Sequence, residues 1–418
     1  MANVFRCWPL LLLFFGAQLH ASAMGLEGLS GFGLDTPGGL GGAVIRVTNL
    51  NADGPGSLRA ALEEKRPRII VFEVGGVIDL RRKNLSIKAP FVTIAGQTAP
   101  SPGITLIRGG ISIRTHDVRI QHIRVRPGDA GQPPRSGWEP DGISVSGAGA
   151  YNVHIDHCSV SWAVDENISV SGPRTLGPEH TARKVTISNS IIAEALDYAS
   201  HRKGRHSKGL LVHDFAREVA VIGNLFAHNA RRNPYFKANT IGVVANNLIY
   251  NPDSAAIQLG YIEDEWREAE FSPETPRVSV VGNLLYYGRD TYSDLALVAY
   301  QGDAFLENNR VYNLDDGLMN IVQGNIRKLD RKPSWLEGFT PRDPEALVEY
   351  LVNHAGARPK DRDPVDRRII ESFIARQGRI IDSQQQVGGY PKSEPSYRPL
   401  TVPEDVGAWL EKLARDIE

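Results

Sequence analysis

Two short stretches, Val118-Arg119-Ile120-Gln121-His122 and Val153-His154-Ile155-Asp156-His157, share one alternation of β-branched and polar residues and both end in histidine. Alternation with a period of two is typical of half-buried β-strands. Similar segments, most of which end in asparagine, occupy residues 185–189, 219–224, 243–247, 278–283 and 305–309. The terminal Asn or His positions recur every 23 to 36 residues or so, which is the repeat length of a solenoid.

A single coil of this size cannot bury its inward face alone, so the coils must stack. Asparagines at matching turn positions can then form ladders of side-chain amides. The alternative is a β-sandwich or jelly roll, but no Asn-Gly hairpin signals separate the strands. The pattern therefore predicts an all-β chain folded as a parallel β-helix.

The character of the sequence changes toward the C-terminus. Residues 344–353 and 403–417 have helical spacing, and Asp363-Pro364 begins another helical run with aspartate as N-cap and proline at the first helical position. We expect a β-helix domain over residues 24–330. Residues 331–418 form a C-terminal extension with short helices, packed along the β-helix or over its end, because an open solenoid end exposes strand edges.

The first 23 residues have the layout of a secretory signal peptide, with one early basic residue, an apolar run and a small-residue cleavage pattern at Ala21-Ser22-Ala23. The alternative is an N-terminal membrane anchor. Removal of this segment takes Cys7 with it and leaves Cys158 alone, so no internal disulfide is possible. The net charge of −1 argues against a nucleic-acid partner. We predict a secreted monomer with no nucleic-acid or membrane partner.

Three sequence features carry a resemblance to a known family. They are the segment from Gly31 to Ile78 with Val47-Thr48-Asn49-Leu50 and Gly54-Pro55-Gly56-Ser57-Leu58-Arg59, then Ile155-Asp156-His157-Cys158-Ser159, and Arg232-Asn233-Pro234. The chain resembles bacterial pectate lyases of polysaccharide lyase family 1. That resemblance implies a right-handed parallel β-helix that cleaves polygalacturonate, an acidic plant cell-wall polysaccharide, by β-elimination with Ca²⁺.

β-Elimination beside a uronate carboxylate needs a cation to neutralise that carboxylate, a base to remove the neighbouring proton, and positive groups to stabilise the developing charge. Calcium prefers oxygen ligands. By resemblance, the calcium-binding positions are Glu139, Asp141 and Asp165. A fourth acidic position of the family is Ser169 here, which weakens the calcium site or makes it depend on substrate. Glu166 is the candidate to compensate, although its side chain should alternate away from Asp165 on a straight strand.

The resemblance also assigns the cations. Arg232 aligns with the arginine that acts as base, and Lys208 with a lysine that contacts the substrate carboxylate. Lys237 stands where the family usually has a second arginine, so substrate binding is expected there too. Arg231 should face the opposite side from Arg232. The basic run 201–208 is otherwise expected to be largely a solvated loop.

Asp156 and His157 could be an acid–base pair, but their place in the repeat favours a structural role, with Cys158 buried in the core. Three other functions stay open. A pectin lyase on methyl-esterified chains is disfavoured by the predicted calcium acids. A polygalacturonase needs paired carboxylates, and the one Asp-Asp pair, Asp315-Asp316, lies beyond the last clear coil. A non-catalytic β-helix that binds uronate polymers remains possible.

Overall fold

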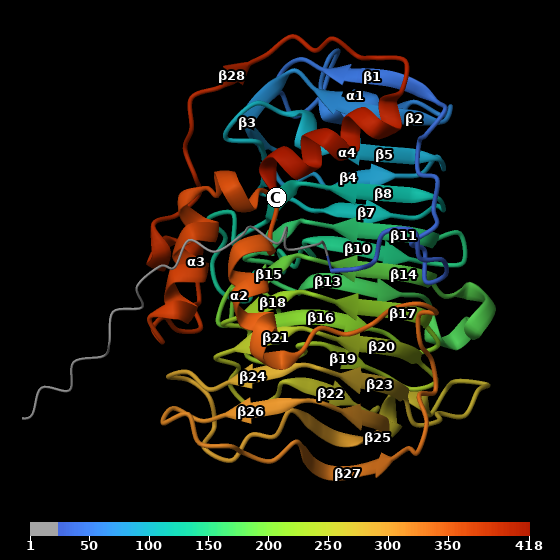
Figure 1. Cartoon of the computed structure of the whole chain (residues 1–418), viewed down its shortest axis with the longest axis vertical. Coiled ribbons are helices and arrows are strands. Elements are labelled where there is room, and N and C mark those ends of the chain that lie inside the picture. The colour runs from blue at the N-terminus through green and yellow to red at the C-terminus, as the bar shows by residue number, and fades with distance from the viewer. Residues whose placement is uncertain (1–23) are drawn as a thin grey trace, which may run out of the picture.

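A computed structural model describes residues 24–418, which coil into a right-handed parallel β-helix with three stacks of strands (Figure 1). The predicted signal peptide, with Cys7, lies outside the described residues. In each coil the chain passes through the first, second and third stacks in turn. Parallel pairing from coil to coil confirms the predicted fold.

The first stack contains β4 (Leu85–Ile87), β7 (Ile111–Ile113), β10 (Ile143–Ser146), β13 (Glu166–Ser171), β16 (Lys208–Val212), β19 (Tyr235–Phe236) and β22 (Ile257–Leu259). The second contains β1 (Ala43–Val47), β2 (Arg68–Phe72), β5 (Val92–Ala95), β8 (Val118–Gln121), β11 (Tyr151–Asp156), β14 (Arg183–Ser188), β17 (Arg217–Ile222), β20 (Ile241–Ala245) and β23 (Arg277–Val281). The long strand β25 (Val298–Glu307) continues both stacks, and β27 (Val322–Lys328) pairs with it.

The third stack contains β3 (Val74–Asp79), β6 (Ile104–Ile107), β9 (Ile123–Arg126), β12 (Ser159–Ser161), β15 (Ile191–Ala193), β18 (Leu225–Ala227), β21 (Leu248–Tyr250), β24 (Leu284–Tyr286) and β26 (Arg310–Tyr312). The two-residue strand β28 (Ser396–Tyr397) pairs antiparallel with β3.

The helices are α1 (Leu58–Glu63), α2 (Pro344–His354), α3 (Pro364–Ile374) and α4 (Val406–Ile417). Single turns of 3₁₀-helix are η1 (Gly96–Thr98), η2 (Arg174–Leu176), η3 (Pro178–His180), η4 (Glu263–Trp266), η5 (Pro359–Asp361) and η6 (Gln384–Val387).

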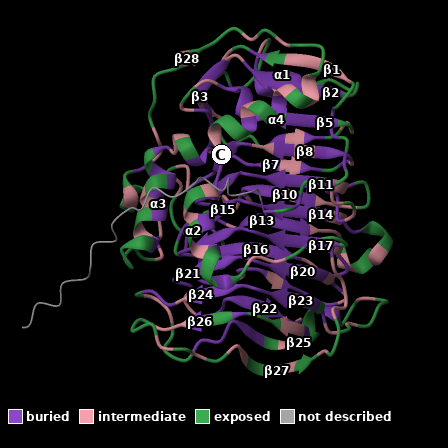
Figure 2. Cartoon of the chain, in the orientation of Figure 1, coloured by how far each residue is buried: buried purple, intermediate pink, exposed green. Residues whose placement is uncertain are grey.

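The segments that predicted the fold are the strands of the second stack, and they pair in register. Ile120 lies opposite Ile155, and Ile155 lies opposite Ile187. Alternate residues of each strand point inward, so branched aliphatic side chains form one continuous buried column (Figure 2).

The predicted amide ladder is present inside the turn after the second stack. Asn224 donates to Asn247, Asn247 to Asn283, and Asn283 to Asn309, each at 3.0 Å. His122 and His157 occupy the turn position one residue before this ladder, where the backbone is left-handed, with φ of 58° and 45°. Cys158 holds the ladder position itself and is fully buried, as predicted.

The three helices predicted for the tail are present, and they lie along the side of the β-helix. Helices α2 and α3 bury Leu351 and Ile369 against an apolar patch on the third stack that includes Leu225 and Leu248. Helix α4 packs Leu410 on the outer side of the second stack. The end of the solenoid nearest the N-terminus is covered by α1 instead, which contributes to the main core.

Buried ion pairs attach the tail to the body. Arg124 and Arg126 on β9 are fully buried, and Arg126 pairs with Asp363 and, at 2.7 Å, with Asp366 at the start of α3. Arg124 Nε lies 3.1 Å from Asp366 Oδ2. Removal of one partner from such a buried set leaves an uncompensated charge, which typically costs about 3–5 kcal/mol.

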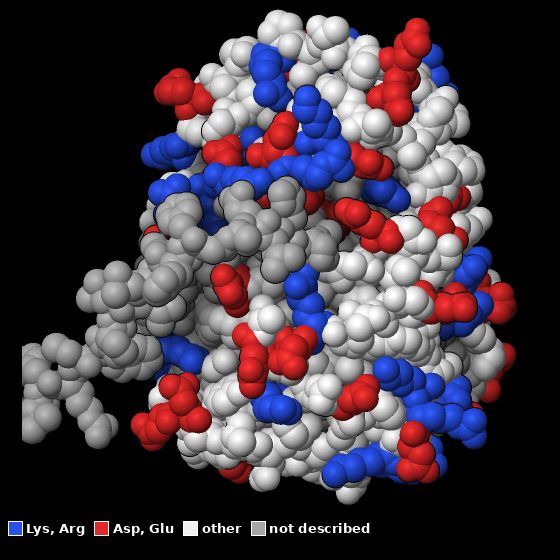
Figure 3. Space-filling model, viewed as in Figure 1, with Lys and Arg blue, Asp and Glu red and all other residues white. Residues whose placement is uncertain are grey.

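The surface shows acidic and basic side chains interspersed over the face in Figure 3, as expected for a net charge of −1. Within residues 24–418, no helix is long and apolar enough to cross a bilayer.

Candidate active site

All the predicted site residues except Lys237 lie in one kind of turn, the connection from the third stack into the first, or directly at its end. Successive coils supply the turns 127–142, 162–165, 194–207 and 228–234. Stacked coils are about 4.8 Å apart, so residues distant in sequence form one line along the β-helix.

Three carboxylates converge at the start of β13. One oxygen from each of Asp141, Asp165 and Glu166 lies within 4.8 Å of the others. Glu166 therefore lies where it can compensate for Ser169, and the alternation expected of a straight strand does not hold, because the chain bends at Asp165 and β13 begins only at Glu166.

Glu139, a predicted calcium ligand, is not part of this trio. Its Oε1 accepts a hydrogen bond of 2.6 Å from the backbone N–H of Arg202 and lies 4.0 Å from His201 Nδ1. The structure thus directs Glu139 toward the 194–207 turn. Glu166 takes its place beside the two aspartates.

Asp141 carries the least favourable charge of the trio. Burial, followed by the nearby negative charge of Asp165, raises the pKa of Asp141 to about 7. Its Oδ1 accepts from the backbone N–H of Glu166 at 3.1 Å, and Oδ2 accepts from Ser169 Oγ at 2.6 Å. The serine at the family's fourth acidic position therefore donates a hydrogen bond where an aspartate would add negative charge.

The side chain of Arg232, which precedes β19, extends past the coil of β16 to the carboxylate trio at the start of β13. Its Nη1 pairs with Glu166 Oε1, and its guanidinium carbon lies 5.6 Å from the centre of the Tyr235 ring. Burial lowers the pKa of Arg232, although the charge of Asp165 opposes this. A lowered pKa suits a base, whereas the ion pair with Glu166 favours the protonated form.

Lys208 is the second cation and lies between these coils, in register with Glu166 on one side and Arg231 on the other. Burial, and then the positive charge of Arg231, lower the pKa of Lys208 to about 8. Arg231 itself is exposed, so its side chain does not contribute to the packing of the β-helix.

Two histidines that the sequence reading left in a solvated loop are part of the site. His206 Nε2 lies 2.7 Å and His201 Nε2 3.6 Å from Asp165 Oδ1, and their rings stack with centroids 3.7 Å apart. These contacts lower the pKa of Asp165 although burial opposes them. The sequence signal for these two residues is that histidines flank the basic run 202–205 on both sides. A basic run of this kind is usually solvent-exposed, so the signal is weak.

Lys237 lies beyond β19, two residues from Tyr235, and is buried. Its ammonium pairs with Glu265 of η4 and lies 3.5 Å from Asp214. Arg174 pairs with the same two acids. Lys237 can therefore take the predicted substrate-binding role only if its ion pair with Glu265 breaks.

Comparison with known proteins places this geometry in a family. The chain is 34% identical over 397 residues to a probable pectate lyase C of Aspergillus oryzae, with 91% of this chain and 84% of that protein covered. The chain belongs to the pectate lyase family. A probable pectate lyase C of Emericella nidulans is 32% identical over 93% of this chain and 86% of its own length. No family model matches the chain.

These pectate lyase relatives are fungal, so the bacterial affiliation inferred from the motifs does not describe them. A plant protein, pectate lyase 5 of Ambrosia artemisiifolia, is 29% identical over 78% of this chain and 79% of its own length. Among solved structures, the cedar pollen allergen Jun a 1 superposes with a TM-score of 0.56 at 19% identity, over 78% of this chain and 92% of that one. A pectate lyase bound to a hexasaccharide gives 0.54 at 15% identity, over 82% and 99% of the two chains. Both show the shared fold.

Proposed function

We propose that this protein is a secreted, calcium-dependent pectate lyase that cleaves polygalacturonate by β-elimination. The observation that carries the proposal is a line of adjoining coils with three carboxylates, the buried Lys208 and the half-buried Arg232, in a chain of the pectate lyase family. Secretion is supported by the signal-peptide pattern of residues 1–23.

The acidic trio fits a hard divalent cation. All its donors are oxygens, and the pKa of Asp141 is raised by burial and by Asp165, so a cation there would relieve unfavourable negative charge. Asp141, Asp165 and Glu166 would hold Ca²⁺, which would neutralise the substrate carboxylate and acidify the adjacent C–H. Glu139 would remain in the turn beside them.

The chain's own residues would do the rest. Arg232 is the proposed base, and its proton affinity depends on Glu166, the carboxylate with which it pairs. Once Glu166 binds another cation, the half-buried Arg232 lies beside Tyr235 without that stabilising partner. Lys208 is placed to bind the substrate carboxylate and to stabilise charge that develops beside it.

The alternative of a hydrolase on the same fold has one observation in its favour. The pKa of Asp141 is raised while that of Asp165 is lowered, and such divergence is also how paired carboxylates divide acid and base roles. Lyase action leaves an unsaturated product that absorbs in the ultraviolet, whereas hydrolysis yields reducing ends without it.

The test is cleavage of polygalacturonate followed by ultraviolet absorbance, with added Ca²⁺ and with excess chelator. We expect the absorbance to rise only with Ca²⁺, and Asp165→Asn to need much more Ca²⁺. Asp264→Asn, a change in an exposed acid of η4, is the matched control. Full activity in chelator would overturn the calcium assignment, and reducing ends without absorbance would overturn the lyase assignment.

A further inference from the structure

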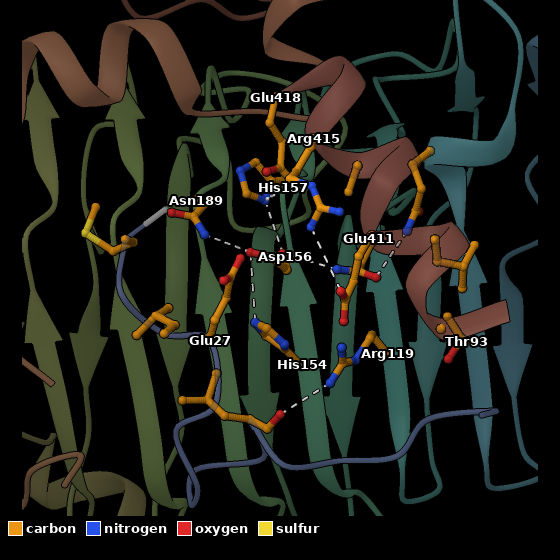
Figure 4. A pocket seen from close by; sticks show the side chains of 18 of the residues that line it. Glu27, Thr93, Arg119, His154, Asp156, His157, Asn189, Glu411, Arg415 and Glu418 are labelled. Atoms are coloured by element: carbon orange, nitrogen blue, oxygen red, sulfur yellow. Dashed lines mark hydrogen bonds and ion pairs between the residues drawn. The ribbon is translucent and has the colours of Figure 1, made fainter. Parts of the chain in front are cut away.

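A second cluster of ligating side chains lies away from the active-site turns, in a cavity of about 300 Å³ between the second stack, α4 and the first described residues (Figure 4). His157 and Glu418 line this cavity, and with the fully buried His122 they form a trio in which one ligand atom of each lies within 4.8 Å of the other two. The two imidazoles stack on successive coils, with centroids 5.2 Å apart and planes 15° apart. Glu418 directly follows α4.

The hydrogen bonds of His122 define its free nitrogen. Nδ1 lies 2.9 Å from the carbonyl oxygen of Ala357, and a carbonyl only accepts, so Nδ1 carries the hydrogen. Nε2 of this fully buried residue has no hydrogen-bond partner anywhere in residues 24–418. It lies 3.4 Å from Glu418 Oε1. A neutral nitrogen lone pair and a carboxylate at this distance repel each other, so either a proton or a metal ion lies between them.

His157 is held by Asp156, whose Oδ1 also accepts hydrogen bonds from Ser188 and Asn189. The Nδ1 of His157 lies 3.1 Å from Asp156 Oδ2 and 3.6 Å from Glu418 Oε1, so one nitrogen faces both carboxylates. Metal-binding histidines usually donate their other ring N–H to a carboxylate or a backbone carbonyl, which fixes the tautomer and the ring orientation. His122 with Ala357 follows this pattern, whereas a metal ion held by His157 and Glu418 would replace the hydrogen between His157 and Asp156.

We propose that His122, His157 and Glu418 form a zinc site that fastens the end of α4 to the β-helix. Two imidazole nitrogens and one carboxylate oxygen suit Zn²⁺, with water from the cavity as a fourth ligand, whereas Ca²⁺ prefers oxygen alone. Two ligands at zinc-binding distance and a tetrahedral angle are about 3.3 Å apart, close to the observed separation of His122 Nε2 and Glu418 Oε1.

The neighbouring Cys158 thiol is not a ligand of this site. Its Sγ donates toward the carbonyl oxygens of Ile120 and Asp156, inside the core. Burial raises the pKa of this thiol to about 12, so it stays protonated. The zinc site also shares no residue with the acidic trio, so its existence does not depend on the proposed lyase activity.

The competing explanation is that a proton alone holds the cluster together. Burial by itself would lower the pKa of His157, but the Asp156 carboxylate outweighs it and raises that pKa to about 9. In that case protonated His157 would pair with Asp156 and Glu418, and zinc would bind no more tightly than to an arbitrary surface site.

The test is zinc content and zinc affinity of the untagged chain, dialysed and then titrated with Zn²⁺ under saturating Ca²⁺. We expect about one equivalent of tightly bound zinc, and a higher unfolding temperature with zinc than after its removal. Glu418→Gln should weaken binding about tenfold or more. Glu411→Gln removes a carboxylate that lines the same cavity but not the cluster, and should leave binding unchanged.

A third variant separates this site from the active site. Asp165, His201 and His206 are another trio able to bind zinc, and Asp165→Asn disables it. Tight zinc that persists in Asp165→Asn and is lost in Glu418→Gln supports the proposal. Tight zinc lost only in Asp165→Asn overturns it, as does the absence of tight zinc or an equal loss in Glu411→Gln.

Discussion

The identity of the base can be decided from how the rate depends on pH, because the two candidate cations titrate in different ranges. Burial, with Arg231, lowers the pKa of Lys208 to about 8, so its neutral fraction is about a tenth at pH 7, a half at pH 8 and nine-tenths at pH 9. Arg232 has a lowered pKa but starts from 12.5. Its neutral fraction therefore grows about tenfold per pH unit while the pH stays below that pKa.

If Arg232 is the base and Lys208 acts as a cation, wild-type kcat/KM under saturating Ca²⁺ should rise from pH 7 and level off above about pH 8, because the gain in neutral Arg232 is offset by the loss of charge on Lys208. In Lys208→Arg, where residue 208 stays charged, kcat/KM should instead climb steadily past pH 9. Arg232→Lys should lose about 10² to 10⁴ in rate, the usual contribution of a general base, or about 2.7 to 5.5 kcal/mol in barrier. The assay is the initial rate of unsaturated-product formation over this pH range. Exposed Arg231 provides the control, since Arg231→Gln should lose little activity and little stability.

Inactivity of Lys208→Arg across this pH range would refute this reasoning and point to Lys208 as the base. Arg231→Gln should move the wild-type inflection to higher pH, because it removes the positive charge that helps to lower the pKa of Lys208. Near wild-type turnover in Arg232→Lys would also exclude Arg232 as the base.

Ser169→Asp should lower the Ca²⁺ concentration for half-maximal activity, because it adds a carboxylate beside Asp141, and it should reduce thermal stability in chelator; an unchanged Ca²⁺ requirement would argue against metal binding there. Glu265→Gln should lower KM for polygalacturonate by releasing Lys237, and a KM that does not move would leave that lysine as a structural ion-pair partner. Asp363→Asn should destabilise the fold by about 3–5 kcal/mol in chemical unfolding, because it leaves buried arginine charge uncompensated; a loss under 1 kcal/mol would show that the tail is held by apolar contacts alone.

The repeat itself was readable because a β-helix is built from local periodicity. Alternation in the stretches ending at His122 and His157 and the recurring asparagines determine strands, coil length and the amide ladder, whatever the loops do. The tail helices were equally local, since Asp363-Pro364 is a capping signal that needs no partner. Cys158 could likewise be assigned to the core from its place in the repeat.

The turns between strands determine which residues form the candidate site. Their backbone paths have no repeating sequence pattern, so they could not be predicted from periodicity. A bend at Asp165 brings Glu166 into the trio, and a single backbone hydrogen bond to Arg202 directs Glu139 elsewhere. The same turns bring two histidines onto Asp165, and η4 supplies Glu265 to neutralise Lys237.

The sequence by itself therefore determined the fold, the family resemblance and the line of turns in which acids and cations meet. Only the tertiary structure decided which carboxylate faces which cation, and that Glu418 meets His122 and His157 although more than 250 positions separate it from either histidine. The physical reason is range. Strand alternation and capping act between residues a few positions apart, whereas ion pairs and ligand sets depend on how non-repeating loops and the tail pack against the coils.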